Sequence, residues 1–132
     1  MGDSTTSWTY STTATIRQSN ASTANTLAVF AGLAEEAFAI NACQAIQPEN
    51  NNDDVFIGIG VNSTTAYSGK RGYVAAGSAA GTGQICDAKA HHIINPALGI
   101  QNINFLESLV GDGNQVFYGG NDDMLMVAEW MG

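Results

Sequence analysis

The chain has 132 residues, which suits one domain that can bury a hydrophobic core without disulfides or metals. Four Lys and Arg against 12 Asp and Glu give a net charge of -8, which excludes a basic nucleic-acid-binding surface and a polybasic membrane patch. With 45% hydrophobic and 12% charged residues, it is not a disordered acidic tail. Small neutral residues take the place of charges: 11 Thr, 9 Ser, 12 Asn and 15 Gly.

Targeting and metal signals are weak throughout the sequence. The segment 1–10 lacks the positive and apolar regions of a signal peptide, and no apolar run approaches the ~18 residues of a membrane span. Cys43 and Cys86 could form one disulfide, but we favour two buried thiols, and no CxxC or His/Cys spacing suggests zinc. We therefore expect no cofactor, no metal and no membrane insertion. The chain should stay in its cell or leave it within an assembled particle.

The first third of the chain alternates apolar and polar residues with period two, which predicts half-buried strands. The first strand is expected over 8–18 and the second over 26–32, with a turn-rich loop at 19–25 between them. Residues 33–38 fit either a helical turn or the approach to a strand over 38–43. We favour the strand because its neighbours are strands and the Ala-rich window is short.

The next region contains a polar loop at 47–54 and a predicted strand over 55–62. Gly58 and Gly60 share one face of that strand, leaving a flat strip that another backbone or a large side chain can approach. A Gly-rich excursion over 63–83 should hold one short strand.

The last part of the chain alternates again. Strands are predicted over 84–94, 100–110, 115–118 and 123–130, with Asn95-Pro96 and Gly-Asn-Asp turns between them. The whole pattern gives about eight or nine short strands separated by turns. This predicts an all-β fold: a single antiparallel, jelly-roll-like β-sandwich over 1–132, with 1–6 as a short N-terminal extension.

Candidate catalytic groups do not form a recognisable set. His91 and His92 are adjacent on a predicted strand, so they should point to opposite faces and cannot share one metal. The acidic turns, Asp53-Asp54, Asp112 and Asp122-Asp123, lack a calcium-loop pattern and should be solvated. We expect no enzyme. A small hydrolase remains an alternative only if His91 or His92 reaches a Ser or a carboxylate in a pocket.

Aromatic residues give a more specific indication. Several lie near strand ends or in loops beside Asn and Asp, where a flat ring and short polar groups can bind sugars. The candidate binding residues are Tyr67, Tyr73, Asn62, Tyr118, Asn121 and Asp122. Trp130, near the end of the chain, is expected in the core or against a neighbouring subunit.

Five segments in this order carry a family resemblance: WTYSTT (8–13), VFAGLAEE (29–36), GIGVNSTT (58–65), INFLE (103–107) and EWMG (129–132). Over residues 7–132 the chain resembles the closing β-rich domain of phage and prophage structural proteins, which form tail-fibre tips, head fibres and other virion appendages. The resemblance implies location in a virion, contacts with other virion proteins of the capsid or tail, and a host-surface receptor or glycan as a further partner. Because only six residues precede the region of resemblance, the chain would be an excised domain or a small decoration protein.

The same resemblance implies a homotrimer, because such appendages are typically trimers. The surfaces that could pack against a symmetry mate are the Gly58/Gly60 strip and the apolar face with Leu125 and Val127, together with Trp130. An autonomous, lectin-like carbohydrate-binding module of cellular origin is the alternative function.

Overall fold

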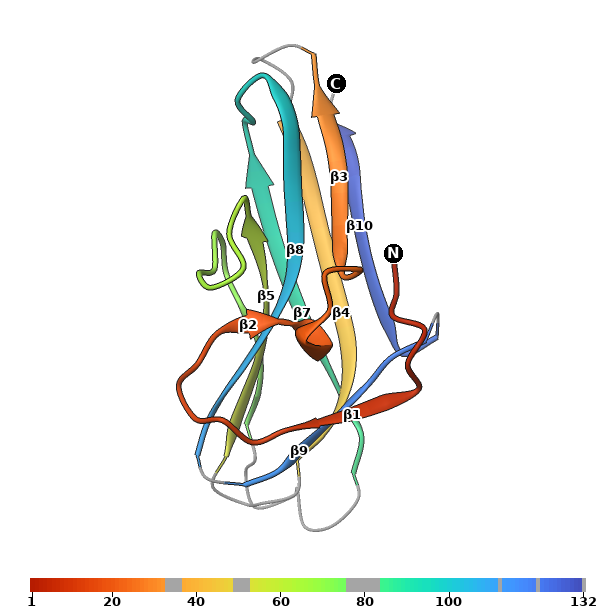
Figure 1. Ribbon diagram of the computed structural model, residues 1–132, viewed down its shortest axis with the longest axis vertical. Coiled ribbons are helices and arrows are strands. Elements are labelled where there is room, and N and C mark those ends of the chain that lie inside the picture. Colours follow the sequence, from red (N-terminus) through yellow and green to blue (C-terminus); the bar gives the residue numbers. More distant parts are fainter. Residues whose placement is uncertain (33–36, 49–52, 76–83, 112, 121, 132) are drawn as a thin grey trace.

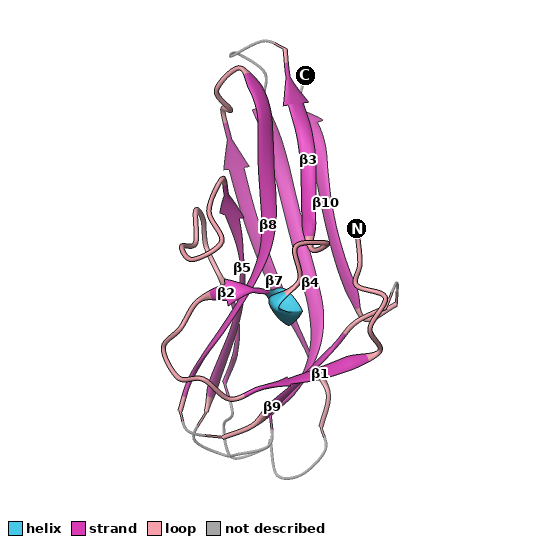
Figure 2. Ribbon diagram, in the orientation of Figure 1, coloured by secondary structure: helices cyan, strands magenta, loops and turns pink. Residues whose placement is uncertain are grey.

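The computed structural model of the chain describes residues 1–32, 37–48, 53–75, 84–111, 113–120 and 122–131. This part of the chain forms ten strands and one 3-10 helix (Figures 1 and 2): β1 (Ser7–Tyr10), β2 (Arg17–Gln18), η1 (Ser19–Ala21), β3 (Thr26–Ala31), β4 (Ala37–Pro48), β5 (Asp54–Val61), β6 (Gly72–Ala75), β7 (Cys86–Ile94), β8 (Gly99–Val110), β9 (Gln115–Tyr118) and β10 (Met124–Met131). Within the described residues, no helix is long and apolar enough to cross a membrane.

Two antiparallel sheets of five strands each form a sandwich. In sheet A, β9 and β10 follow one another along one side of β4, β1 pairs with β9, and β7 pairs with the other side of β4. In sheet B, β8 pairs with β2 and β3 on one side and with β5 on the other, and β5 also pairs with β6. The predicted all-β sandwich is confirmed.

The pairing follows a nested pattern. Strand β1 pairs with β9, β3 with β8, β4 with β7 and β5 with β6. Each pair encloses the next in sequence, so the chain follows one long hairpin that is wound over two sheets. This is a jelly-roll topology, in which strands distant in sequence become neighbours.

The predicted strand over 8–18 is divided in two. Ala14 has a left-handed φ of 59°, and its N–H donates to Leu109 O at 2.9 Å. At this point the chain passes from sheet A, which contains β1, to sheet B, which contains β2. Period-two alternation continues through such a crossing, so it could not show that the strand stops.

The core lies between the sheets and follows the predicted alternation on β4. Phe38, Ile40 and Ala42 are buried, while Asn41 on the opposite face is exposed. This confirms the strand over 38–43. Residues 33–36, which could have formed a helical turn, lie outside the described residues.

The N-terminal segment is part of the sandwich rather than a loose extension. The N-terminal ammonium of Met1 donates to Met126 O at 3.0 Å, and Met126 N–H donates back to Met1 O at 2.9 Å. Asp3 is buried, and its carbonyl accepts the N–H of Gly120 at 2.6 Å. Residues 1–6 therefore cover part of the edge of β10 and the turn before it.

Candidate interaction surfaces

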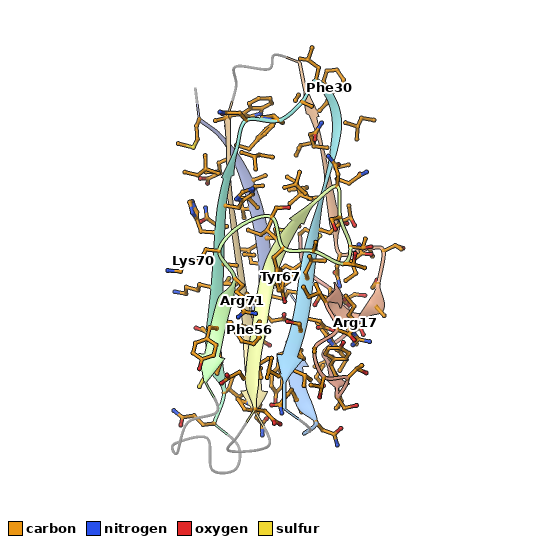
Figure 3. All side chains as sticks on the ribbon, turned by 90° about the vertical axis from the view of Figure 1, so that its left-hand side faces the viewer. Arg17, Phe30, Phe56, Tyr67, Lys70 and Arg71 are labelled. Carbon is orange, nitrogen blue, oxygen red and sulfur yellow. The ribbon has the colours of Figure 1, made fainter. Side chains whose placement is uncertain are left out.

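One end of the sandwich exposes four large apolar side chains, which we call the apolar tip: Phe30 (68% exposed), Ile100 (67%), Leu98 (64%) and Trp130 (53%). They lie where β3 and β10 end and where β8 begins, at the upper end of the molecule in Figure 1. Figure 3 shows Phe30 at this end. Soluble monomers rarely expose a large apolar patch, and such patches commonly mark an interaction site.

Local structure explains why these side chains are exposed. Phe30 and Ile100 are cross-strand partners on the outer face of sheet B. Trp130 stands opposite Phe38 and packs on it, with ring centroids 4.1 Å apart, but it lies at the open end of the sandwich. The packing on Phe38 buries only about half of the indole. The prediction that Trp130 contacts a neighbouring subunit remains a prediction.

A shallow apolar trough crosses the outer face of sheet A. Small side chains on β4, including Cys43, lie between longer ones on β7 and β10, and Leu125 and Val127 form the β10 wall. The trough has a volume of about 270 Å³. Farther along the same face, Ile93 and Met131 are about half exposed, which extends the apolar surface toward the tip.

The glycine strip on β5 is covered by the chain itself. A Cβ at Gly58 would lie 2.2 Å from Cδ1 of Tyr67, and one at Gly60 would lie 2.3 Å from Ser63 O. Figure 3 shows Tyr67 over this sheet, where its hydroxyl lies 2.7 Å from Oγ of Ser108. A large side chain does approach the strip, as expected, but it belongs to the same chain. The strip is therefore not free for a symmetry mate.

Neighbouring residues cover much of Tyr67, one of the candidate binding residues. Burial raises the pKa of its phenol to about 12, although the hydrogen bond with Ser108 lowers it. The ring packs on Gly58, and the prediction that Tyr67 binds a sugar stays a prediction.

The other predicted binding residues do not form one site. Tyr73 on β6 is exposed, packs on Phe56 with centroids 5.3 Å apart, and donates to Asp54 at 3.0 Å. Tyr118 lies on β9 in the other sheet and donates its hydroxyl hydrogen to Gln47. Asp122 is exposed in the turn before β10, and Asn121 lies outside the described residues.

Asn62 belongs to a groove on the outer face of sheet B. Its backbone is left-handed, with φ of 55°, its Oδ1 accepts the N–H of Asn102 at 2.9 Å, and its Nδ2 donates to Gln101 at 2.8 Å. We call this the polar groove and define it by its lining residues: Gln18, Thr23, Thr26, Asn62, Thr64, Asn102 and Asn104.

The two histidines point to opposite faces of β7, as predicted. His91 is exposed on the outer face, while His92 is half buried, and burial followed by the nearby His91 lowers the pKa of His92. Neither forms a hydrogen bond with a Ser or a carboxylate of the described residues, which is the contact that the hydrolase alternative requires. The described residues also contain no group of three or more His, Cys, Asp or Glu arranged to hold a metal. The thiols of Cys43 and Cys86 are free and half buried.

One predicted solvated acid is a structural residue. Asp53 is fully buried and accepts a hydrogen bond from the side-chain amide of Gln115. Its neighbour Asp54 is the first residue of β5 and accepts the Tyr73 hydroxyl. Asp123 is exposed, as expected, and Asp112 lies outside the described residues.

The most densely connected polar group was not singled out from the sequence. Glu107 on β8 is fully buried and pairs with Arg17 at 2.6 Å. It also accepts hydrogen bonds from the Trp8 indole at 2.8 Å, the Ser19 hydroxyl at 3.2 Å and the Asn20 N–H at 3.2 Å. Burial raises the pKa of Glu107, and Arg17 and these donors lower it in part. The cluster fastens β1, β2 and η1 to β8.

Comparisons with protein-family models, with curated proteins and with solved structures give no significant match to this chain.

Proposed function

We propose that the chain is a non-enzymatic structural protein of a phage virion, an appendage or decoration domain that assembles as a homotrimer and contacts capsid or tail proteins. The proposal rests on the apolar tip. Its four side chains are each more than half exposed: Phe30, Leu98, Ile100 and Trp130. A protein that acts alone in water gains nothing from this arrangement, whereas an assembling protein buries it.

Burial of the apolar tip would favour assembly. Fully burying one large apolar side chain contributes about 1.5–3 kcal/mol, so covering the tip would contribute several kcal/mol toward the cost of association. The trough with Leu125 and Val127 adds a second apolar surface on the same body. The small number of cations, four Lys and Arg in the whole chain, limits the side-chain entropy and desolvation that such contacts cost.

The proposal is tested on particles purified from lysates of cells that carry the gene. We expect the chain in the particle fraction at a fixed copy number and on the particle surface by immunogold labelling. The double variant Phe30→Ser/Trp130→Ser should be folded but absent from particles. Wild-type chain found only in the soluble fraction would contradict the virion role and favour the alternative, a cellular carbohydrate-binding module.

Receptor contact is the second part of the proposed role. The polar groove supports it, because it is a preformed concave surface on the opposite sheet from the trough.

A further inference from the structure

The polar groove is lined by seven side chains, all of them hydroxyls or carboxamides. The buried Asn104 on β8 forms its floor, and the exposed Asn102 on the same strand lies at its mouth. Residues between 18 and 26 form one wall, and Asn62 and Thr64 form the other. Its volume, about 420 Å³, lies in the range of small-molecule sites. The lining contains no charged residue.

The floor is held in one orientation by backbone carbonyls. Nδ2 of Asn104 donates to Gly60 O at 3.3 Å and to Ser63 O at 3.0 Å. Because carbonyl oxygens only accept, the Oδ1 of Asn104 must face the other way. There it accepts from the Thr26 hydroxyl at 2.7 Å and from Nε2 of Gln18 at 3.1 Å.

This arrangement leaves the side-chain oxygen of Gln18 as an acceptor for a ligand. Gln18 is only 9% exposed, and its Nε2 is committed to Asn104 and to the Thr26 hydroxyl, 2.6 Å away. Its Oε1 therefore points away from both, and among the described residues it accepts no hydrogen bond. This oxygen is not one of the buried polar atoms without a partner, so water reaches it, and a ligand hydroxyl can donate to it in place of water.

The rim adds further unused groups. The side chains of Thr23, Thr64 and Asn102 are exposed, and none of them hydrogen-bonds to any described residue. The groove thus combines a rigid, hydrogen-bonded floor with free donors and acceptors at its mouth. Such a preformed site loses little conformational entropy when a ligand binds.

We propose that the polar groove binds a neutral saccharide. The hydroxyls of a sugar donate and accept, which matches a lining of carboxamides and hydroxyls. An anionic ligand would find no Lys or Arg in the lining, and a cation would find no carboxylate. An apolar ligand would leave the amides desolvated and unpaired. The inference rests on the receptor-binding part of the proposed function and gives that receptor a chemical class.

The test is a binding screen of the folded protein against immobilised neutral oligosaccharides of glucose, galactose, mannose and N-acetylglucosamine, with uronate- and sialate-containing sugars as acidic counterparts. Hits are measured in solution by NMR titration. We expect binding of a neutral member, with shifts in the amides of Thr64 and Asn102. The variants Asn102→Ala and Thr64→Val should weaken binding about three- to tenfold, the loss that one hydrogen bond gives.

Matched controls come from the same chain. Thr65→Val changes the exposed neighbour of Thr64, which does not line the groove, and Asn114→Ala changes an exposed Asn before β9. Both should bind within twofold of the wild type. The inference is overturned if no neutral sugar binds at millimolar concentration, if only acidic sugars bind, or if the groove variants bind as well as the controls. Particle incorporation and oligomeric mass should be unchanged in the groove variants, so failure here is distinguishable from failure of the assembly role.

Discussion

The indole Nε1–H of Trp8 donates a 2.8 Å hydrogen bond to Oε2 of Glu107, 99 residues away in the sequence. Trp8 lies on β1 in sheet A and Glu107 on β8 in sheet B, so this contact joins the two sheets through the core. Arg17 completes the junction by pairing with the other carboxylate oxygen and by lying over the Tyr10 ring, 3.9 Å from its centroid. The junction fixes the first 20 residues onto the sandwich.

Removing Arg17 should therefore destabilise the fold. Arg17→Met leaves the Glu107 carboxylate buried without its cation, and we expect a loss of about 2–3 kcal/mol at neutral pH, less than for a fully buried pair because Arg17 is partly exposed. The measurement is urea unfolding. Arg71→Met is the control, since the exposed Arg71 lies over the ring of Phe56, 3.7 Å from its centroid, and its loss should cost under about 1 kcal/mol.

The same variant has a predicted pH dependence. The pKa of Glu107 is already raised by burial and should rise further without Arg17, which lowers it. A carboxyl with a raised folded pKa supports folding below the unfolded value, near 4.5, and that support is lost as pH rises through the folded pKa. The wild type loses part of this support too, so the stability deficit of Arg17→Met should grow as pH rises from the folded pKa of Glu107 in the wild type to its higher folded pKa in the variant. A deficit that is constant with pH would contradict the assigned pairing.

The phenol of Tyr67 should titrate at a higher pH than the phenols of the other tyrosines. Burial raises the pKa of its phenol to about 12. In an NMR titration of ring-labelled tyrosine, the signal that disappears in Tyr67→Phe should be the last to shift. A Tyr67 signal that titrates near 10, the ordinary value, would place the ring in solvent.

Gly58→Ala tests the contact between Tyr67 and Gly58 from the β5 side. The new Cβ would lie 2.2 Å from Cδ1 of Tyr67, so the ring must move, and we expect a loss of about 1–3 kcal/mol and a fall in the pKa of Tyr67. Gly32→Ala is the matched control, because its Cβ would meet Phe30 at an ordinary 3.8 Å. Equal stability of the two variants would show that Tyr67 does not rest on Gly58.

His92 should make the fold sensitive to mild acid. Burial and the neighbouring His91 lower its pKa below the usual 6.5. A histidine with a lowered folded pKa contributes stability above 6.5, and this contribution is lost as pH falls toward the folded pKa. The stability difference between wild type and His92→Gln should therefore shrink over this range. A difference that increases on acidification would contradict the burial of this ring.

The sequence predicted the fold well wherever a strand stays in one sheet. Strands β3, β5 and β7 to β10 lie within two residues of the predicted ranges. Strand β4 contains the predicted strand over 38–43 but continues to Pro48, into the predicted loop. Alternation failed at Ala14, where the chain changes sheets, because the pattern records which side is buried and not which sheet buries it.

It was harder to predict from the sequence which side chains outside the strands are exposed and which are covered. Composition placed Asp53 in a polar loop and Tyr67 in a Gly-rich excursion, yet contacts with other segments cover both residues, and composition does not show such contacts. Glu107 did carry a signal, since period two aligns it with the inward-facing Ile103 and Phe105. A charge at an inward position indicates a buried pair, and the partner Arg17 is one of only four cations.

Sedimentation velocity over a range of concentrations measures whether the chain assembles through the apolar tip. We predict that the wild type sediments as a trimer and that Phe30→Ser/Trp130→Ser, which changes only exposed or half-exposed side chains, sediments as a folded monomer. A control substitution at the far end of the sandwich, Val110→Ser, should leave the trimer intact. A wild type that remains monomeric at every concentration, or a tip variant that still forms trimers, would contradict the account.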